Sequence, residues 1–239
     1  MKNSKNFSNL IKLVLSLILF FYSYLVQIIP ILIFNINTET ASPNTKYALQ
    51  LFSNTFLLIA LFFIYRKELI EEFKKFKKNF WEMSDTAVKY WMIGLLVMAI
   101  SNILIGTFSP TKIANNEKEV QNIITTVPII SIFLTTILAP LNEEIIFRKS
   151  IKNTIKQKIP YILTSGLLFG SLHVITNISS LYDYLYIIPY SALGLAFAKI
   201  NYETDNVFPC VLVHMIHNGA LTMFSILGAG MLLWNQELN

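Results

Sequence analysis

Two adjacent glutamates and a following arginine, Glu143, Glu144 and Arg148, stand in an otherwise apolar stretch of the sequence. An ionisable side chain inside a membrane segment is costly, so a functional role or a supporting ion pair is the default hypothesis for it. On an α-helix Glu144 and Arg148 are i,i+4 neighbours that can pair, whereas Glu143 is rotated by about 100° from Glu144. We therefore predict a neutralised Glu144 and a free Glu143. A free carboxylate in apolar surroundings has its charged form disfavoured, which makes it a better proton acceptor and suits it to general-base chemistry.

A plainer interpretation places the two glutamates at the cytoplasmic end of a helix, where their charges would lie among lipid headgroups. Arg148 argues against it, because Arg66 is the only other arginine in a chain whose remaining basic residues are all lysines. The planar guanidinium fork matches a carboxylate in a way that an ammonium group cannot. An arginine at this position therefore favours a buried ion pair with Glu144.

All three histidines, His173, His214 and His217, follow the glutamates and lie in apolar segments. His214 and Asn218 are i,i+4 neighbours on one helix face, which His217 either joins or borders. A single histidine in a membrane is as often a hydrogen-bonded structural residue as a catalytic one. Three segments that each carry a polar cluster instead suggest convergence on one water-filled cavity. A carboxylate base combined with imidazole and amide donors is the equipment needed for hydrolysis.

The order of these residues resembles a known family. The chain carries three motifs along its second half: Glu143-Glu144-x-x-Phe147-Arg148, then Phe169-x-x-x-His173, then His214-x-x-x-Asn218. Together they resemble the signature of the CAAX-type and bacteriocin-processing intramembrane endopeptidases, the CPBP or Abi family, over residues 123–220. Each motif alone is weak, but three in order on successive predicted helices are a strong match. The resemblance implies an intramembrane endopeptidase that cleaves membrane-associated peptides or proteins.

The resemblance also implies a role for each motif residue. A glutamate activates water, a histidine assists it, and a second histidine and an asparagine stabilise the oxyanion; in this chain these four are Glu143, His173, His214 and Asn218. The remaining two motif residues, Glu144 and Arg148, would support the structure. Bacterial members process leader or pheromone peptides or act in immunity, and the Lys-, Asn- and Ile-rich composition suggests a bacterial source. Peptide or leader processing, or an immunity function, is therefore expected.

Metal use and two other functions stay open at this point. No His-Glu-x-x-His motif occurs, and water activated by Glu143 without a cofactor is favoured. If zinc is used, Glu143, His173 and His214 would be its ligands, with water in the fourth position. One competing function is a non-catalytic membrane immunity or peptide-sequestering protein of the same fold. The other is a proton-coupled transporter, for which buried Glu and His residues would also be expected. The sequence contains no inverted repeat, which argues against a transporter.

Composition defines the class of protein. The chain has 239 residues, of which 54% are hydrophobic and 14% charged, and its mean hydropathy is +0.54. Such values, with apolar runs of about 20 residues, are typical of a polytopic membrane protein. Its lysines fall between apolar runs, so the net charge of +5 indicates topology, and no nucleic-acid partner is expected. Cys210 is the only cysteine, which excludes an intrachain disulfide.

The apolar runs predict an all-α transmembrane helix bundle with seven spans and a short eighth helix that begins near Asn218. The expected spans are 13–36, 47–65, 90–108, 123–141, 161–176, 184–200 and 207–234. Residues 1–122 would hold the N-terminal spans and a basic amphipathic cytoplasmic segment, and residues 123–239 the catalytic helix bundle of one integral membrane domain. In the basic segment Phe73, Phe76, Phe80 and Trp81 recur near helical spacing, which suits a helix at an anionic membrane surface or a solvated linker.

Charge placement predicts the orientation. With the amino terminus inside the cell, only three of the 19 Lys and Arg residues fall in outer loops: Lys46, Lys112 and Lys118. This bias indicates a multi-pass protein of the cell membrane with a cytoplasmic amino terminus and a site toward the cytoplasmic side. The expected partners are membrane lipid and a peptide or membrane-protein substrate.

Depth places a condition on the site. Glu143 and His173 must face each other across one cavity, yet a fifth span that begins near Pro160 places His173 about 20 Å from the inner face. The fourth span must therefore continue as far as Ile151, or the fifth helix must extend into the cytoplasm. Pro128 and Pro140 are expected to kink the fourth span and to free backbone carbonyls near the glutamates.

Overall fold

The structure, a computed structural model, describes residues 2–110 and 113–237, and the side chains of residues 6–110 and 113–228. Lys112, assigned to an outer loop above, lies outside the described residues, as do the outermost ends of the two predicted regions. Every element within the described ranges is helical, which confirms the all-α prediction. Six helical segments are long and apolar enough to cross a membrane, so the polytopic bundle is confirmed as well.

The first half of the chain forms three long helical segments and a short one. These are α1 (Lys2–Tyr22), continued by η1 (Ser23–Gln27) and α2 (Ile28–Ile33), then α3 (Pro43–Lys78), α4 (Phe80–Phe108) and α5 (Asn115–Thr126). Helix α3 begins where its residues favour a start, because the Ser42 hydroxyl accepts a hydrogen bond from the Thr45 amide at 3.2 Å and Pro43 occupies the first turn.

The second half contains one broken span and three further helices. The broken span, residues 128–154, consists of α6 (Pro128–Ser131), the π-helix η2 (Ile132–Leu138), α7 (Ala139–Glu143), the π-helix η3 (Glu144–Ser150) and α8 (Ile151–Thr154). It is followed by α9 (Lys158–Ile175), the 3-10 turn η4 (Leu181–Tyr186), α10 (Ile187–Thr204) and α11 (Phe208–Glu237). Pro140 lies between the two π-helical segments, where its missing amide hydrogen interrupts regular α-helical bonding.

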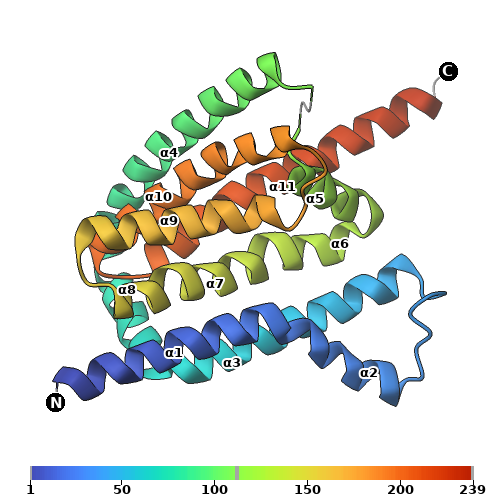
Figure 1. The fold of residues 1–239 in the computed structure, drawn as a ribbon. Coiled ribbons are helices and arrows are strands. Elements are labelled where there is room, and N and C mark those ends of the chain that lie inside the picture. Colours follow the sequence, from blue (N-terminus) through green and yellow to red (C-terminus); the bar gives the residue numbers. More distant parts are fainter. Residues whose placement is uncertain (1, 111–112, 238–239) are drawn as a thin grey trace.

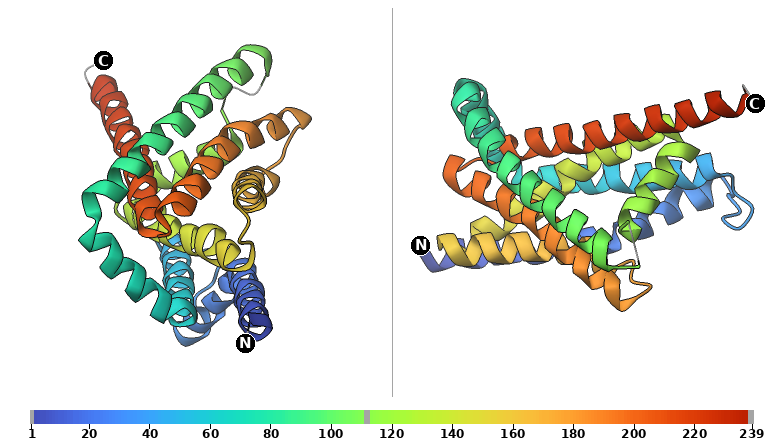
Figure 2. Two further views of the ribbon diagram at one scale, coloured as in Figure 1. Left: turned by 90° about the vertical axis from the view of Figure 1, so that its left-hand side faces the viewer. Right: turned by 90° about the horizontal axis from the view of Figure 1, so that it is seen from above.

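The broken span occupies the middle of the bundle. Figure 1 shows α1 and α3 on one side of it, and α9, α10 and then α4 on the other. The turns that join α3 to α4, α8 to α9 and α10 to α11 lie at the same end as the amino terminus, and α5 lies at the opposite end. Helix α11 extends along the bundle past η2, as the view from above in Figure 2 shows. The basic segments counted above are therefore gathered at one end.

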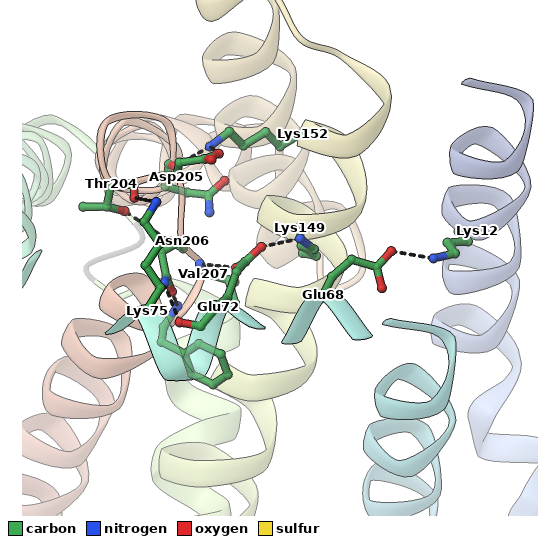
Figure 3. Close-up of polar contacts among 12 residues, drawn as sticks. Lys12, Glu68, Glu72, Lys75, Lys149, Lys152, Thr204, Asp205, Asn206 and Val207 are labelled. Carbon is green, nitrogen blue, oxygen red and sulfur yellow. Dashed lines mark hydrogen bonds and ion pairs between the residues drawn. The ribbon is translucent and has the colours of Figure 1, made fainter. Parts of the chain in front are cut away.

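A set of polar contacts connects the helices at that end (Figure 3) and is called the polar network here. The Glu72 carboxylate pairs with Lys149 and accepts a hydrogen bond from the Val207 amide at 2.8 Å. The Glu72 carbonyl accepts a second bond, from the Asn206 side chain at 2.6 Å. One residue of α3 thus joins the broken span to the start of α11. The other contacts of the network are Lys12–Glu68, Lys152–Asp205 and Lys75–Thr204.

Glycines allow α9 and α10 to pack closely. A Cβ atom on Gly166 would lie 2.7 Å from Leu195, and one on Gly170 would lie 2.5 Å from the Ser191 amide nitrogen. One on Gly194 would lie 2.5 Å from the Gly166 carbonyl. The small-xxx-small spacing of Gly166 and Gly170 therefore serves helix packing, as that pattern commonly does in membranes.

Four details differ from the sequence-based expectations. Pro128 begins the fourth span rather than kinking it, because Val127 is not helical and residues 115–126 form a separate helix. The basic segment that begins at Arg66 does not form a helix of its own, because its residues as far as Lys78 are the last turns of α3. Helix α11 passes through Asn218 without a break, since no proline follows to end it, so the predicted eighth helix was wrong. Polar residues near the end of α10 leave it outside the six candidate spans.

Candidate active site

Glu144 and Arg148 form an ion pair in the centre of the bundle. Their side chains are 0% exposed, and Arg148 Nε lies 2.9 Å from Glu144 Oε2. Arg148 Nη1 also donates to the Ser165 hydroxyl at 2.8 Å, and that hydroxyl donates to the Phe147 carbonyl at 2.6 Å. The guanidinium lies over the Phe169 ring, 4.8 Å from its centroid. The i,i+4 pairing predicted from the sequence is present, with a serine and an aromatic ring of α9 supporting it.

Glu144 also holds one of the histidines. Its Oε1 atom lies 2.9 Å from Nδ1 of His214 on α11. Because a carboxylate paired with Arg148 accepts hydrogen bonds, Nδ1 carries the ring proton. The Nε2 atom of His214 then lies 3.8 Å from Oε2 of Glu143. Glu144 therefore orients the imidazole whose other nitrogen faces the neighbouring glutamate.

His173 approaches Glu143 from α9. Its Nε2 atom lies 3.8 Å from Glu143 Oε2, so the predicted facing of the two side chains is confirmed. Its Nδ1 atom lies 2.8 Å from the Phe169 carbonyl oxygen, which can only accept a hydrogen bond, so the proton is on Nδ1. The Tyr190 ring stacks on the imidazole at 5.1 Å between centroids. These contacts fix both the tautomer and the orientation of the ring.

Three acceptor atoms therefore converge when both rings are neutral. They are Oε2 of Glu143 and Nε2 of His173 and His214, and the separations of 3.8 Å exceed a direct hydrogen bond of about 3.2 Å. Oε2 of Glu143 has no hydrogen-bond partner among the residues that the structure describes. A shared proton, a cation or a donating water is needed to satisfy such a set. The arrangement suits a water molecule held for deprotonation.

Asn218 lines the same cavity and binds the broken span. Its Nδ2 atom donates to the Thr135 carbonyl at 2.9 Å. In π-helical bonding the partner of that carbonyl would be the amide of residue 140, which is a proline and has no hydrogen. The prediction that Pro140 leaves a carbonyl available near the site is consistent with this contact. One N–H of the Asn218 amide is left for another acceptor.

The cavity that contains these groups has a volume of about 160 Å³. Side chains from α4, α5, the broken span, α9, α10 and α11 line it, among them Glu143, His173, His214, His217 and Asn218. His217 is buried and meets the edge of the Trp91 ring at 6.4 Å between centroids. The structure thus brings together all four predicted catalytic residues. Tyr190, Thr135 and Glu117 also line the cavity, and no sequence pattern had indicated them.

The site lies deeper than expected. Glu143 precedes the end of α8 at Thr154 by eleven residues, or about 16 Å at 1.5 Å per residue. The fourth span therefore runs past Ile151, which was the condition for Glu143 and His173 to meet. The cavity then continues to Asn116 and Glu117 of α5, at the end opposite the basic turns. The site is accordingly in the interior of the bundle and not close to the end that carries the basic turns.

Zinc stays the alternative to water activated by Glu143 alone. The candidate donors are Glu143, His173 and His214. Within residues 2–110 and 113–237, no group of three His, Cys, Asp or Glu side chains has an arrangement that would hold a metal ion. We therefore derive no catalytic step through a metal.

Comparison with known proteins finds a family model and curated relatives that this chain resembles in part. Residues 125–220 match the family model described as "Type II CAAX prenyl endopeptidase Rce1-like". The putative membrane peptidase YdiL of Bacillus subtilis (strain 168) is 28% identical over 108 residues, which cover 44% of this chain and 41% of YdiL. The membrane-embedded CAAX protease MroQ of Staphylococcus aureus (strain USA300) is 25% identical over 142 residues, covering 57% of this chain and 55% of MroQ.

A third relative, an uncharacterized protein of Mycoplasma capricolum, is 30% identical over 114 residues, which cover 47% of this chain and 31% of that protein. The chain thus matches about a third to a half of the length of these relatives. No solved structure matches it significantly. All three motifs lie inside the matched range, so the resemblance predicted from them is confirmed: residues 125–220 are similar to the Rce1-like CAAX prenyl endopeptidases.

Proposed function

We propose that the protein is an intramembrane endopeptidase in which Glu143 activates water without a bound metal. The observation that carries the proposal is the position of Glu143 Oε2, which lies 3.8 Å from Nε2 of both His173 and His214 inside one cavity. The neighbouring carboxylate is already neutralised by Arg148, so only Glu143 is free to take a proton. The family model that residues 125–220 match describes an endopeptidase, which supports the cleavage of peptide bonds.

The reaction requires a water molecule between the carboxylate and the imidazoles. Glu143 removes one proton from the water while its oxygen attacks the carbonyl carbon of the substrate peptide bond. The carbon–nitrogen bond then breaks, and the proton passes from Glu143 to the leaving nitrogen, so the products are a carboxylic acid and an amine. His173, held by Phe169 and Tyr190, positions the water.

The carbonyl oxygen gains negative charge during the attack. Asn218 offers an amide N–H to this oxygen. His214, whose ring Glu144 orients through Nδ1, is the second residue proposed to stabilise this oxygen, and it can do so only with a proton on Nε2. The roles of Glu144 and Arg148 are therefore to hold His214 and to keep a second charge out of the cavity.

The substrate is a membrane-associated peptide or protein, because the cavity lies inside the helix bundle. The relatives YdiL and MroQ are bacterial membrane proteins described as a peptidase and a protease. Processing of bacterial leader peptides, or an immunity function based on such cleavage, fits this class of substrate. Membrane lipid is then a partner of the protein in all of these settings.

The test compares the peptides in membranes of cells that carry the wild type, Glu143→Gln or Glu71→Gln. Glu71 is an exposed glutamate of α3 and serves as the matched control. New peptide termini are expected with the wild type and Glu71→Gln and are expected to disappear with Glu143→Gln. A biological effect that persists in Glu143→Gln, without any terminus that depends on Glu143, would instead identify a peptide-sequestering protein.

A further inference from the structure

Glu117 of α5 places a second carboxylate in the candidate active-site cavity. It lines that cavity together with Asn116 and Val120 of the same helix, whereas Glu143 enters from the broken span. The Asn116 side chain donates to the Tyr190 hydroxyl at 3.2 Å, which ties this part of α5 to the tyrosine that stacks on His173. Helix α5 is thus a wall of the site.

A neighbouring cavity of about 300 Å³ adjoins the first one at Glu117. The two cavities share four lining residues: Met98, Glu117, Tyr190 and Leu221. The others that line the second cavity are uncharged, so Glu117 is its only charged side chain among the described residues. A peptide whose scissile bond lies at Glu143 and whose chain continues into the second cavity must pass this carboxylate.

The charge of Glu117 is not balanced within the described residues. Its side chain accepts a hydrogen bond from the neutral Gln121 amide at 3.0 Å. The nearest lysine in the sequence, Lys118, donates instead to Asn115 at 3.2 Å. An anionic group at the junction of two cavities inside the protein attracts a cation and repels an acidic group, because the protein around it screens its field less than water does.

We propose that Glu117 makes the site selective for peptides with a basic side chain, Lys or Arg, on the side of the scissile bond that enters the second cavity. The proposal rests on the proposed function, since it names the substrate class of the same site. Glu117 is a specificity residue that pairs with the substrate and takes no part in the proton transfers. An acidic residue at the same position of the peptide is rejected by like-charge repulsion.

A structural role makes a different prediction. Glu117 lies in the first turn of α5, where a carboxylate also stabilises the helix through its dipole. A purely structural Glu117 would change the folded amount on substitution but not the choice of peptide. Glu119 is a suitable control, because it belongs to the same helix, binds Asn177 at 2.9 Å and lines neither cavity.

The first experiment measures binding, so that it does not depend on turnover. Purified full-length Glu143→Gln protein in detergent micelles is titrated with fluorescent apolar peptides that differ only in one residue, Lys, Gln or Glu, moved through successive positions. At one or more positions the Lys peptide is expected to bind about tenfold more tightly than the Gln peptide, as one charge-assisted hydrogen bond predicts. Adding Glu117→Gln should abolish this preference, Glu117→Lys should transfer it to the Glu peptide, and Glu119→Gln should leave it unchanged.

A preference for Lys that persists in Glu117→Gln, or equal or undetectable binding of the three peptides at every position, would overturn the proposal. The second experiment reads the peptide termini in membranes. Termini that depend on Glu143 should carry Lys or Arg near the cut, and Glu117→Lys should remove them while Glu119→Gln retains them. Termini without a basic residue refute the selectivity alone. If no terminus depends on Glu143, the endopeptidase fails and the binding series still decides the selectivity.

Discussion

Glu143 and Glu144 are consecutive in the sequence, but their carboxylates have opposite surroundings. Glu144 lies 2.9 Å from Arg148 and 2.9 Å from His214 and is completely buried. Oε2 of Glu143 faces the cavity and accepts no hydrogen bond from a described residue. A rotation of about 100° around the helix separates the two environments. A membrane bundle can therefore keep one carboxylate available for chemistry when its neighbour is neutralised, since a single charge is left to compensate.

A third glutamate extends the comparison to the end of the bundle that carries the amino terminus. Glu72 is paired like Glu144, but its partners are Lys149 and the amide of Val207, just before α11. It joins the helix that carries Glu143 to the helix that carries His214. Glu143 is thus the reactive group, Glu144 a buried support and Glu72 a link between helices. Each of these roles predicts a different result on substitution.

The largest effect on activity is expected at Glu143. Replacing it by Gln preserves the shape and removes the base, so cleavage should fall by about 100- to 10,000-fold. The thermal midpoint of the purified protein should stay the same, because no partner loses a contact. Glu71→Gln, on the exposed face of α3, should change neither quantity. A fall in thermal midpoint for Glu143→Gln as large as for variants of Arg148 would show that both residues are structural.

The largest effect on stability is expected at Arg148. Arg148→Met leaves the Glu144 carboxylate buried without its cation, which should lower the free energy of unfolding by about 3–5 kcal/mol. Arg148→Lys should recover only part of this loss, because an ammonium group cannot bind Glu144 and Ser165 in the same fork geometry. The yield of monodisperse protein and its thermal midpoint measure both effects. Arg66→Lys is the control, since Arg66 is exposed and the chain has no other arginine.

Glu72 should have an intermediate effect. Glu72→Gln keeps an acceptor for the Val207 amide but loses the ion pair with Lys149, which should cost about 1–3 kcal/mol of unfolding free energy. A double-mutant cycle with Lys149→Met isolates the pair, and the double variant should be more stable than the sum of the single changes implies. Additive losses would show that Glu72 and Lys149 act independently, and Glu71→Gln again provides the neighbouring control.

The parts of the site that were predictable are those set by local geometry. The i,i+4 spacing was sufficient for the Glu144–Arg148 pair, and three motifs on successive helices were sufficient for the convergence of Glu143, His173 and His214. The features of the site that could not be predicted from the sequence depend on contacts between distant segments. Ser165 and Tyr190 are ordinary membrane-helix residues until packing brings them to Arg148 and His173, and the depth of each group depends on helix tilt.

Some helix boundaries were predicted wrongly from the sequence, and the structure shows why. Pro128 carried a readable signal, because the residue before a proline disfavours the α conformation, and Val127 indeed has φ −139° and ψ 68°. The π-helical segments on either side of Pro140 have no such signal. In the first of them the Thr135 carbonyl binds the Asn218 side chain, a contact that depends on the packing of α11. In α11, Gly219 packs against Thr136 and does not end the helix.

A smaller effect is expected at Asp205, in the turn between α10 and α11. The Lys152 ammonium, which donates to Asp205 at 2.7 Å, holds the pKa of this carboxyl below its ordinary value of 3.8. The pair therefore stabilises the fold above that pH and loses its contribution as the pH falls below it. Asp205→Asn should lower the unfolding free energy by only a few tenths of a kcal/mol, because the side chain is 79% exposed. Asn also tolerates the positive φ of 48° at this position, whereas Asp205→Ala adds backbone strain and should cost more.

The smallest effect is expected from metal removal. If Glu143 activates water by itself, a zinc chelator should leave cleavage and thermal midpoint unchanged, and the purified protein should contain less than one equivalent of any transition metal. The three acceptor atoms of Glu143, His173 and His214 make this a demanding test, since a cation between them would satisfy the same hydrogen-bonding deficit as a water molecule. Loss of cleavage with the chelator, restored by zinc in the wild type, would transfer the activation of water from the carboxylate to a metal. The comparison of the two glutamates would then remain, with Glu143 as a ligand in place of a base.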